Sequence, residues 1–261
     1  MAFSGSTRVN LYFPANLPKA RKAVVLFYGL PRHYPLDYSN PAVKNFLNKN
    51  FLVLCPEYEG TFGSAGKFSC AGSLRSALGA INLAMKGSCV DAWSGKKMRW
   101  KVNEVVLAGA SFGGAVALVA GAKSPFVKTI VSLAPVTDFG KHAQAREEKE
   151  GFSALRKQIE NAFPRLWKID SPAWKKMEGG AVDLNAVEYA SVLAQKNVLL
   201  IHGVDDGVVS VMRSRELIKL LNALGGKGKR KLVELQKAGH VGVGLLGSAS
   251  VFGKVEKFLK N

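Results

Sequence analysis

The sequence predicts an α/β fold in which helices cover both faces of a mostly parallel central sheet. Two observations lead to this prediction. Short apolar runs rich in β-branched residues alternate along the chain with segments long enough to form helices. The chain also has 261 residues, 48% of them hydrophobic and 21% charged, so one large domain can bury a substantial core without disulfides.

The strands are predicted from their apolar content. Residues 7–13 alternate apolar and polar side chains, as an edge strand does. Residues 23–28, with the sequence AVVLFY, are apolar throughout and end at Gly29, as expected of a buried strand. In chain order, further strands are predicted over residues 51–55, 103–108, 129–135, 197–202 and 230–236.

The helices are predicted between these strands, where the connecting segment is long enough to form one. A glycine-rich loop over residues 60–66 separates the strand at 51–55 from a long helix. In chain order, the predicted helices cover residues 40–50, 69–86, 113–123, 210–224 and 248–260.

One stretch interrupts the alternation. Residues 139–190 are charged and helical in character, with scattered aromatic residues. Ser153 is predicted to cap a helix that Pro164 ends, and Pro172 to open the next one. Because roughly fifty residues are too many for a plain connection, we expect an α/β core of residues 1–138 and 191–261 with a small helical cap insertion, residues 139–190.

The formal net charge of +18 is the unusual feature of the composition. Basic residues cluster at 96–101 and at 227–231, and Trp100 touches the first cluster. Neither cluster is interleaved with stacking aromatic residues or set on a recognition helix. We therefore interpret the charge as a solvated basic surface and disfavour nucleic-acid binding.

The remaining composition limits the compartment and the cofactors. The three cysteines lack paired spacing, which predicts reduced thiols and neither a disulfide framework nor a metal site. No apolar run reaches the ~18 residues of a membrane span, and no signal peptide is visible at the N-terminus. We expect a cytoplasmic protein without a membrane span.

The candidate nucleophile is Ser111. It lies in Gly109-Ala110-Ser111-Phe112-Gly113, a G-x-S-x-G motif between a predicted buried strand and a predicted helix of small residues. In this context the motif forms a sharp strand-to-helix turn that exposes the serine hydroxyl. The Phe112 N–H would then lie at a helix N-terminus, where it can stabilise a developing oxyanion.

A serine hydroxyl needs a base to take its proton and an acid to hold that base. His240 follows the last predicted strand, so a short loop can bring it over the turn. Asp206 is the favoured acid, with Asp205 beside it and Asp138 after an earlier strand as alternatives. A second oxyanion donor is expected from the loop after AVVLFY, and we assign the Leu30 N–H.

These segments resemble the α/β-hydrolase superfamily, and within it the catalytic domain of the prolyl-oligopeptidase family and related single-domain carboxylesterases. The resemblance rests on YGLP, PEYEGTFGSAGKF, GASFGG, LLIHGVDDGVV and AGH, covers most of the chain and is weakest in the cap. In that pattern the acid is the fourth residue after the LLIHG histidine, which again selects Asp206. The sequence departs from the family at Tyr28, Glu59 and Ser210, which leaves the substrate class open.

The resemblance implies a serine hydrolase that cleaves carboxylic esters of small acyl substrates through an acyl-enzyme. The chain has no room for the propeller of the oligopeptidases, so a small-ester hydrolase is favoured. No metal or organic cofactor is required, and the expected partner is a small-molecule ester. Two alternatives stay open: a serine peptidase of prolyl-oligopeptidase type, acylaminoacyl- or aminopeptidase-like, and a non-catalytic hydrolase-like binding protein. The sequence leaves a homo-oligomer open.

Overall fold

The structure is a computed structural model that describes residues 1–17, 21–32 and 36–260, with all their side chains except those of residues 146–150. Its strands, in chain order, are β1 (Ala2–Ser4), β2 (Thr7–Tyr12), β3 (Lys22–Phe27), β4 (Phe51–Pro56), β5 (Ser88–Val90), β6 (Lys97–Arg99), β7 (Glu104–Ala110), β8 (Val127–Leu133), β9 (Asn197–Gly203) and β10 (Arg230–Leu235). Its helices are α1 (Pro41–Asn48), α2 (Cys70–Lys86), α3 (Phe112–Lys123), α4 (Phe139–Gln144), α5 (Arg146–Ala162), α6 (Ser171–Glu178), α7 (Ala190–Leu193), α8 (Val211–Leu224) and α9 (Ala249–Lys260), with 3-10 helices over Ala186–Tyr189 (η2) and Val243–Gly247 (η3).

An eight-stranded sheet runs through the centre in the order β1-β2-β4-β3-β7-β8-β9-β10. All pairings from β4 to β10 are parallel, and β2 and β1 extend one edge with antiparallel pairings. This confirms the mostly parallel sheet predicted from the alternation of strands and helices. The short strands β1, β5 and β6 were not predicted, because three residues are too few to show a period.

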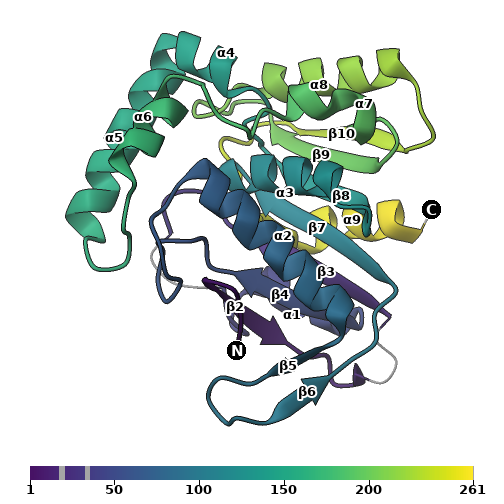
Figure 1. Ribbon diagram of the computed structural model, residues 1–261. Helices are drawn as coiled ribbons and strands as arrows, with labels where there is room; N and C mark the ends of the chain where they lie inside the picture. Colours follow the sequence, from purple (N-terminus) through teal and green to yellow (C-terminus); the bar gives the residue numbers. More distant parts are fainter. Residues whose placement is uncertain (18–20, 33–35, 261) are drawn as a thin grey trace.

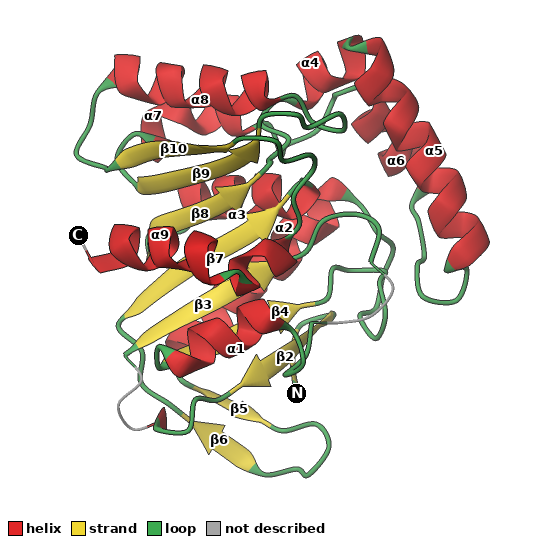
Figure 2. Cartoon of the chain, turned by 180° about the vertical axis from the view of Figure 1, so that it is seen from behind, coloured by secondary structure: helices red, strands yellow, loops and turns green. Residues whose placement is uncertain are grey.

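Alternate residues of the central strands supply two hydrophobic cores, one on each face of the sheet. In β3, Val24 and Leu26 face a core that contains residues of α1 and α9, such as Phe46 and Phe252. The intervening Val25 faces the other core, which contains α2, α3 and part of α8. The period of two in an extended chain explains this division, and Figures 1 and 2 show the helices covering both faces.

Helices α4, α5 and α6 lie beyond the carboxyl ends of the parallel strands, as Figure 2 shows. α5 begins at Arg146, earlier than expected, so Ser153 does not cap it. The Ser153 hydroxyl instead donates to Glu178 at 3.2 Å. Pro164 follows the end of α5 and Pro172 lies in the first turn of α6, as predicted. Within the described ranges, no helix is long and apolar enough to cross a membrane.

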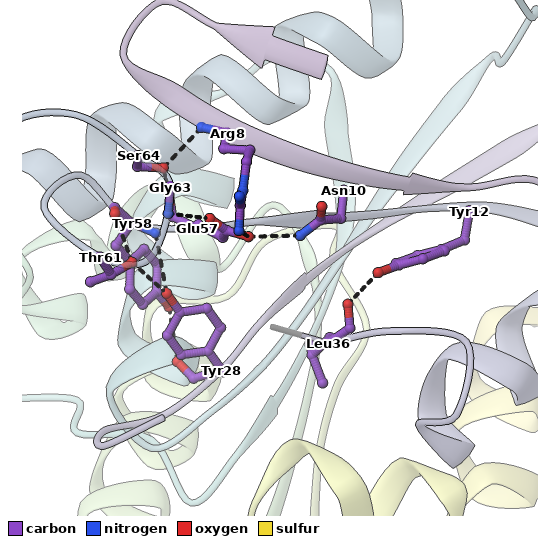
Figure 3. Close-up of polar contacts among 10 residues, drawn as sticks. All are labelled: Arg8, Asn10, Tyr12, Tyr28, Leu36, Glu57, Tyr58, Thr61, Gly63 and Ser64. Carbon is purple, nitrogen blue, oxygen red and sulfur yellow. Dashed lines mark hydrogen bonds and ion pairs between the residues drawn. The ribbon is translucent and has the colours of Figure 1, made fainter. Parts of the chain in front are cut away.

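A buried carboxylate fixes the edge of the sheet where β2 meets the loop after β4. Glu57 is 1% exposed and accepts hydrogen bonds from Arg8 at 2.6 Å, Asn10 at 2.9 Å and the Gly63 N–H at 3.0 Å. Its own carbonyl accepts from the Ser64 hydroxyl at 2.7 Å. Figure 3 shows these residues converging on Glu57 from the strand and from the loop. The carboxylate therefore connects two segments that the sequence separates widely.

Glu57→Ala should lower the free energy of unfolding by about 3 kcal/mol, because removal of one partner leaves buried donors without their acceptor. Urea denaturation measures the change. Glu104→Ala is the matched control: Glu104 pairs with Lys22 at 3.0 Å, but 26% of its side chain is exposed, so its removal should cost at most about 1 kcal/mol. Equal losses in the two variants would contradict a special role for Glu57.

Candidate active site

Ser111 occupies the turn between β7 and α3 in a backbone conformation that residues other than glycine rarely adopt. Its φ is 56° and its ψ is −122°, so the chain turns sharply at the carboxyl end of the strand. A Cβ at Gly109 would lie 2.1 Å from the Gly113 carbonyl oxygen, and a Cβ at Gly113 would lie 2.4 Å from that of Tyr28. A side chain at Gly109 or Gly113 would therefore overlap a backbone carbonyl, so both positions of the motif require glycine. The Ser111 N–H donates to the Leu133 carbonyl at 2.8 Å, which fixes the turn to β8.

His240 and Asp206 come from neighbouring loops and meet at the same edge of the sheet. Asp206 follows β9, His240 follows β10, and His240 Nδ1 lies 2.8 Å from Asp206 Oδ2. The Asp206 side chain is fully buried, whereas 26% of the His240 side chain is exposed. An ionised carboxylate can only accept, so Nδ1 carries the shared proton. In the neutral ring this leaves Nε2 as the proton acceptor.

A close backbone contact holds the two loops together. A Cβ at Gly203, the last residue of β9, would lie 2.3 Å from the Ala238 carbonyl oxygen and 2.2 Å from that of Gly239. The same Ala238 carbonyl accepts from the Asp205 N–H at 3.0 Å. The missing side chain at Gly203 therefore lets the loop that carries His240 lie directly against the end of β9.

A second histidine, His202, contacts the same carboxylate from within the core. Its side chain is fully buried, and its Nε2 lies 3.2 Å from Asp206 Oδ2 and 2.8 Å from the Val209 carbonyl oxygen. Both partners are acceptors, so Nε2 carries a proton that they share. Its Nδ1 lies 2.7 Å from the Ser214 hydroxyl, which donates to it when the ring is neutral. His202 is a positioning residue for Asp206 that the sequence analysis did not assign. Its place in the LLIHG segment was the available signal.

The Asp206 carboxylate is well supplied with donors. Its Oδ1 accepts from the N–H groups of Val208 and Val209, each at 2.9 Å. Burial alone would raise the pKa of Asp206, but the hydrogen bonds from His202, His240 and the Val209 N–H together hold it well below the usual range. These hydrogen bonds therefore favour the ionised form of Asp206.

The alternative acids do not reach His240. Asp205 is exposed, and Asp138 caps α4 by accepting from the Lys141 N–H at 3.0 Å. Within the described part of the chain, Asp206 alone among the three candidates contacts His240. In that same part, no group of three or more His, Cys, Asp or Glu side chains could hold a metal ion.

The expected oxyanion donors flank Ser111. Phe112 is the first residue of α3, so its N–H has no acceptor within the helix. Leu30 follows Gly29, and a Cβ at Gly29 would lie 3.0 Å from the Ser111 Cβ and 3.1 Å from the Ala110 carbonyl oxygen. The loop after β3 therefore lies directly against the candidate nucleophile. Among the described residues, no backbone hydrogen bond engages the Leu30 N–H.

Two buried tyrosines fix the start of this loop. The Tyr58 hydroxyl donates to the Tyr28 carbonyl at 2.9 Å, and the Tyr58 N–H donates to the Tyr28 hydroxyl at 3.2 Å. The Tyr28 hydroxyl also lies 2.9 Å from Thr61 Oγ1 (Figure 3). Burial, the largest influence, raises the pKa of Tyr28, so the hydroxyl stays protonated. Tyr28 thus holds the loop through its side chain and its carbonyl.

The other two departures from the family pattern also have structural roles. Glu59 pairs with Arg75 at 2.5 Å and accepts from the Ser6 hydroxyl at 3.1 Å. Ser210 caps α8 by accepting from the Met212 N–H at 3.3 Å. These contacts explain the departures without reference to a substrate.

A cavity of about 350 Å³ opens over Ser111 and lies between the core and the helices α4 and α5. Core residues Ser111, Phe112 and His240 line one part of it, and Phe152 and Leu155 of α5 line another. The remaining lining residues are mostly apolar: Leu30, Pro31, Val136, His142, Gly151, Ala154, Gln158, Val208 and Val209. Ser111 and His240 thus face one space, although no hydrogen bond joins the Ser111 hydroxyl to the His240 ring among the described residues. Such bonds are often long before substrate binds.

Comparisons with known proteins identify the family and the fold. The sequence matches the prolyl oligopeptidase family over residues 38–261. Among curated proteins, none matches it significantly.

Similar solved structures include an esterase, a lipase and a peptidase. Est1E from Butyrivibrio proteoclasticus is 17% identical with a TM-score of 0.68, over 98% of this chain and 95% of that one. The monoacylglycerol lipase of Paleococcus ferrophilus is 17% identical with a TM-score of 0.64, over 97% and 98%. The acylaminoacyl peptidase of Pyrococcus horikoshii is 16% identical with a TM-score of 0.60, over 89% of this chain and 35% of that one. These likenesses show the α/β-hydrolase fold.

Gly203→Ala should separate His240 from Asp206, because the added methyl group overlaps the Ala238 carbonyl and displaces the histidine loop. The measurement is the strongly downfield proton NMR signal of an imidazole N–H bound to a carboxylate, assigned by its loss in His240→Gln. We expect this signal to disappear in Gly203→Ala while the circular dichroism spectrum is retained.

Gly207→Ala is the matched control in the same loop, since a Cβ there meets nothing within 4 Å. Its downfield signal should persist. A folded Gly203→Ala protein with an unchanged signal would show that the close approach at Gly203 does not set the geometry of the pair.

Proposed function

Because the chain belongs to the prolyl oligopeptidase family of serine hydrolases, we propose that it cleaves carboxylic esters of small acyl substrates through Ser111, His240 and Asp206. The observation that carries this proposal is the convergence of Ser111 and the bonded His240–Asp206 pair on one largely apolar cavity. The division into a core of residues 1–138 and 191–261 and a cap of residues 139–190 is part of the proposal, since α4 and α5 supply part of the cavity wall.

In the first half-reaction, the Ser111 hydroxyl oxygen attacks the ester carbonyl carbon while His240 Nε2 takes its proton. Asp206 holds the ring through Nδ1 and stabilises the imidazolium that forms. The backbone N–H groups of Leu30 and Phe112 donate to the oxyanion of the tetrahedral intermediate, each worth roughly 10²–10³ in rate if well placed. His240 then gives the proton to the leaving alkoxide oxygen, and an acyl-enzyme remains.

In the second half-reaction, His240 takes a proton from water, which attacks the acyl carbonyl. Collapse of the second tetrahedral intermediate returns the proton to Ser111 and releases the carboxylic acid. The partly exposed His240 ring supports this step, because water can reach it from the open side.

The cavity lining favours an ester over a peptide with a free amino terminus. An aminopeptidase needs an anionic group to hold the α-ammonium of its substrate, and no carboxylate is among the described lining residues. Phe152, Leu155, Val136 and Val208 instead offer apolar surface for an acyl chain or ring. Structural neighbours described as an esterase and a monoacylglycerol lipase support the same chemistry.

Ser111→Ala should lower kcat for p-nitrophenyl esters by roughly 10⁶, because the members of a triad act as a unit. Stopped-flow or steady-state release of p-nitrophenol measures it. The matched control is Ser250→Ala, which removes an exposed serine on α9 and should leave kcat unchanged.

A fluorophosphonate probe should also label the protein once, at Ser111, and fail to label Ser111→Ala. The absence of labelling in the folded wild-type protein would favour a non-catalytic binding protein. Labelling together with faster turnover of aminoacyl-anilides than of esters would replace the esterase by a peptidase.

The pH dependence of kcat/KM should show one ionisation on its acidic side. The rate falls on that side because only a neutral base can take the proton of the Ser111 hydroxyl. Asp206 adds no second step, because its pKa is held well below the usual range. A plot of log(kcat/KM) against pH should therefore have a slope of about one on that side. A slope of two, or no dependence on pH, would contradict these roles.

A further inference from the structure

The β5–β6 hairpin is a separate two-stranded sheet outside the central one. Figures 1 and 2 show it projecting from the body near β1 and β2, away from α4–α6. The hairpin turn is joined to the edge of the sheet by a hydrogen bond from the Ala92 N–H to the Met1 carbonyl, 2.9 Å. The proposed hydrolase chemistry uses no residue of this hairpin.

The two faces of the hairpin differ in character. Cys89 pairs across the strands with Met98, and both are half-buried against the body. Val90 pairs with Lys97, and Ser88 pairs with Arg99. Because directly paired residues point to the same face, Val90, Lys97 and Arg99 share the outer face. The outer face is therefore both apolar and basic.

The most exposed tryptophan of the chain stands in the turn of this hairpin. Trp93 is 82% exposed, and Val90 beside it is 58% exposed. Trp100, the aromatic residue that the sequence places within the basic cluster, is half-buried and donates from its indole N–H to the Ala84 carbonyl at 2.8 Å. Trp93, and not Trp100, is thus the aromatic side chain available to a partner. Trp93 and Val90 together leave apolar surface of the hairpin open to solvent.

The charges around Trp93 are almost all positive. Lys96, Lys97 and Arg99 are exposed. The acid in the turn, Asp91, accepts from the Ser94 N–H at 3.1 Å and from its hydroxyl at 2.6 Å. Val90, Trp93, Lys96, Lys97 and Arg99 together form what we call the hairpin patch.

We propose that the hairpin patch docks the protein on the surface of anionic lipid bilayers. The amphipathic indole of Trp93 lies at the boundary between headgroups and acyl chains, where tryptophan is favoured, and Val90 enters beside it. Lys96, Lys97 and Arg99 contact the acidic headgroups around this point. This docking is peripheral and requires no membrane-spanning segment.

A bilayer fits the hairpin patch better than a nucleic acid does. Nucleic-acid sites for single strands combine a basic groove with a row of stacking aromatic residues. The hairpin patch is a protruding turn with one aromatic residue, and the aliphatic Val90 has no counterpart on a phosphate backbone. A protruding hairpin that carries exposed apolar side chains together with exposed cations matches a surface that is anionic outside and apolar beneath.

The test is cosedimentation with vesicles of phosphatidylcholine and phosphatidylserine at an ionic strength of about 0.15 M, with pure phosphatidylcholine as the reference. The wild-type protein should bind the mixed vesicles, with a blue shift of tryptophan fluorescence that Trp93→Ala abolishes. Trp93→Ala should lower the partition coefficient roughly tenfold. Joint replacement of Lys96, Lys97 and Arg99 by Gln should lower it on the order of 100-fold.

Joint replacement of Lys227, Lys229 and Lys231 by Gln is the matched control, because it removes three exposed cations from the other basic cluster. It should change the partition coefficient by only a few-fold. Equal losses from the two charge variants, or no effect of Trp93→Ala, would reduce the binding to diffuse attraction and overturn the proposal. Tighter binding to a single-stranded oligonucleotide that Trp93→Ala abolishes would overturn it in favour of nucleic acid. Ester hydrolysis in solution is measured in every variant, so the outcome does not depend on the proposed function.

Discussion

Three backbone segments meet around Ser111 more closely than side chains would allow. Gly113 lies against the Tyr28 carbonyl, Gly109 lies against Gly113, and Gly29 lies against Ser111 itself. The buried strands on either side hold these segments in place, which is how a serine with positive φ can be maintained at the end of β7. The same contacts therefore position both the turn that carries the Ser111 hydroxyl and the loop that carries the Leu30 N–H.

A similar close backbone contact at a glycine positions the loop that carries His240. Gly203 ends β9 against the Ala238 carbonyl. The loop after β10 therefore packs directly on the end of β9, and His240 lies within hydrogen-bond distance of Asp206. Hydrogen bonds also stabilise the charge of the buried Asp206 carboxylate. A fully buried carboxylate would be protonated in an apolar setting, but His202, His240 and two backbone N–H groups stabilise its charge. The Asp206 carboxylate is therefore held in position and favoured in its ionised form.

The sequence was sufficient for whatever depends on local pattern and chain order. It indicated the parallel sheet, the turn at Ser111 and the order in which an acid and a base should follow. It could not show contacts between distant segments. The pairing of Glu59 with Arg75 and the bond between Tyr58 and Tyr28 join residues that no periodicity connects. The sequence alone left the substrate class open at Tyr28 and Glu59, whereas the structure shows contacts of both residues within the fold.

The net charge of +18 follows from composition, whereas its distribution over the surface depends on the fold. Several of the 19 acidic residues make contacts within the fold, where they pair with arginines, cap helices or orient a histidine; examples are Glu57, Glu59, Glu234, Asp138, Asp170 and Asp206. Most of the lysines that the structure describes are exposed and set the sign of the surface. A cluster of exposed lysines is therefore common on this surface and does not by itself identify a partner. Trp93 differs, because 82% of it is exposed. This exposed tryptophan, and not the charge, distinguishes the hairpin from the 227–231 cluster.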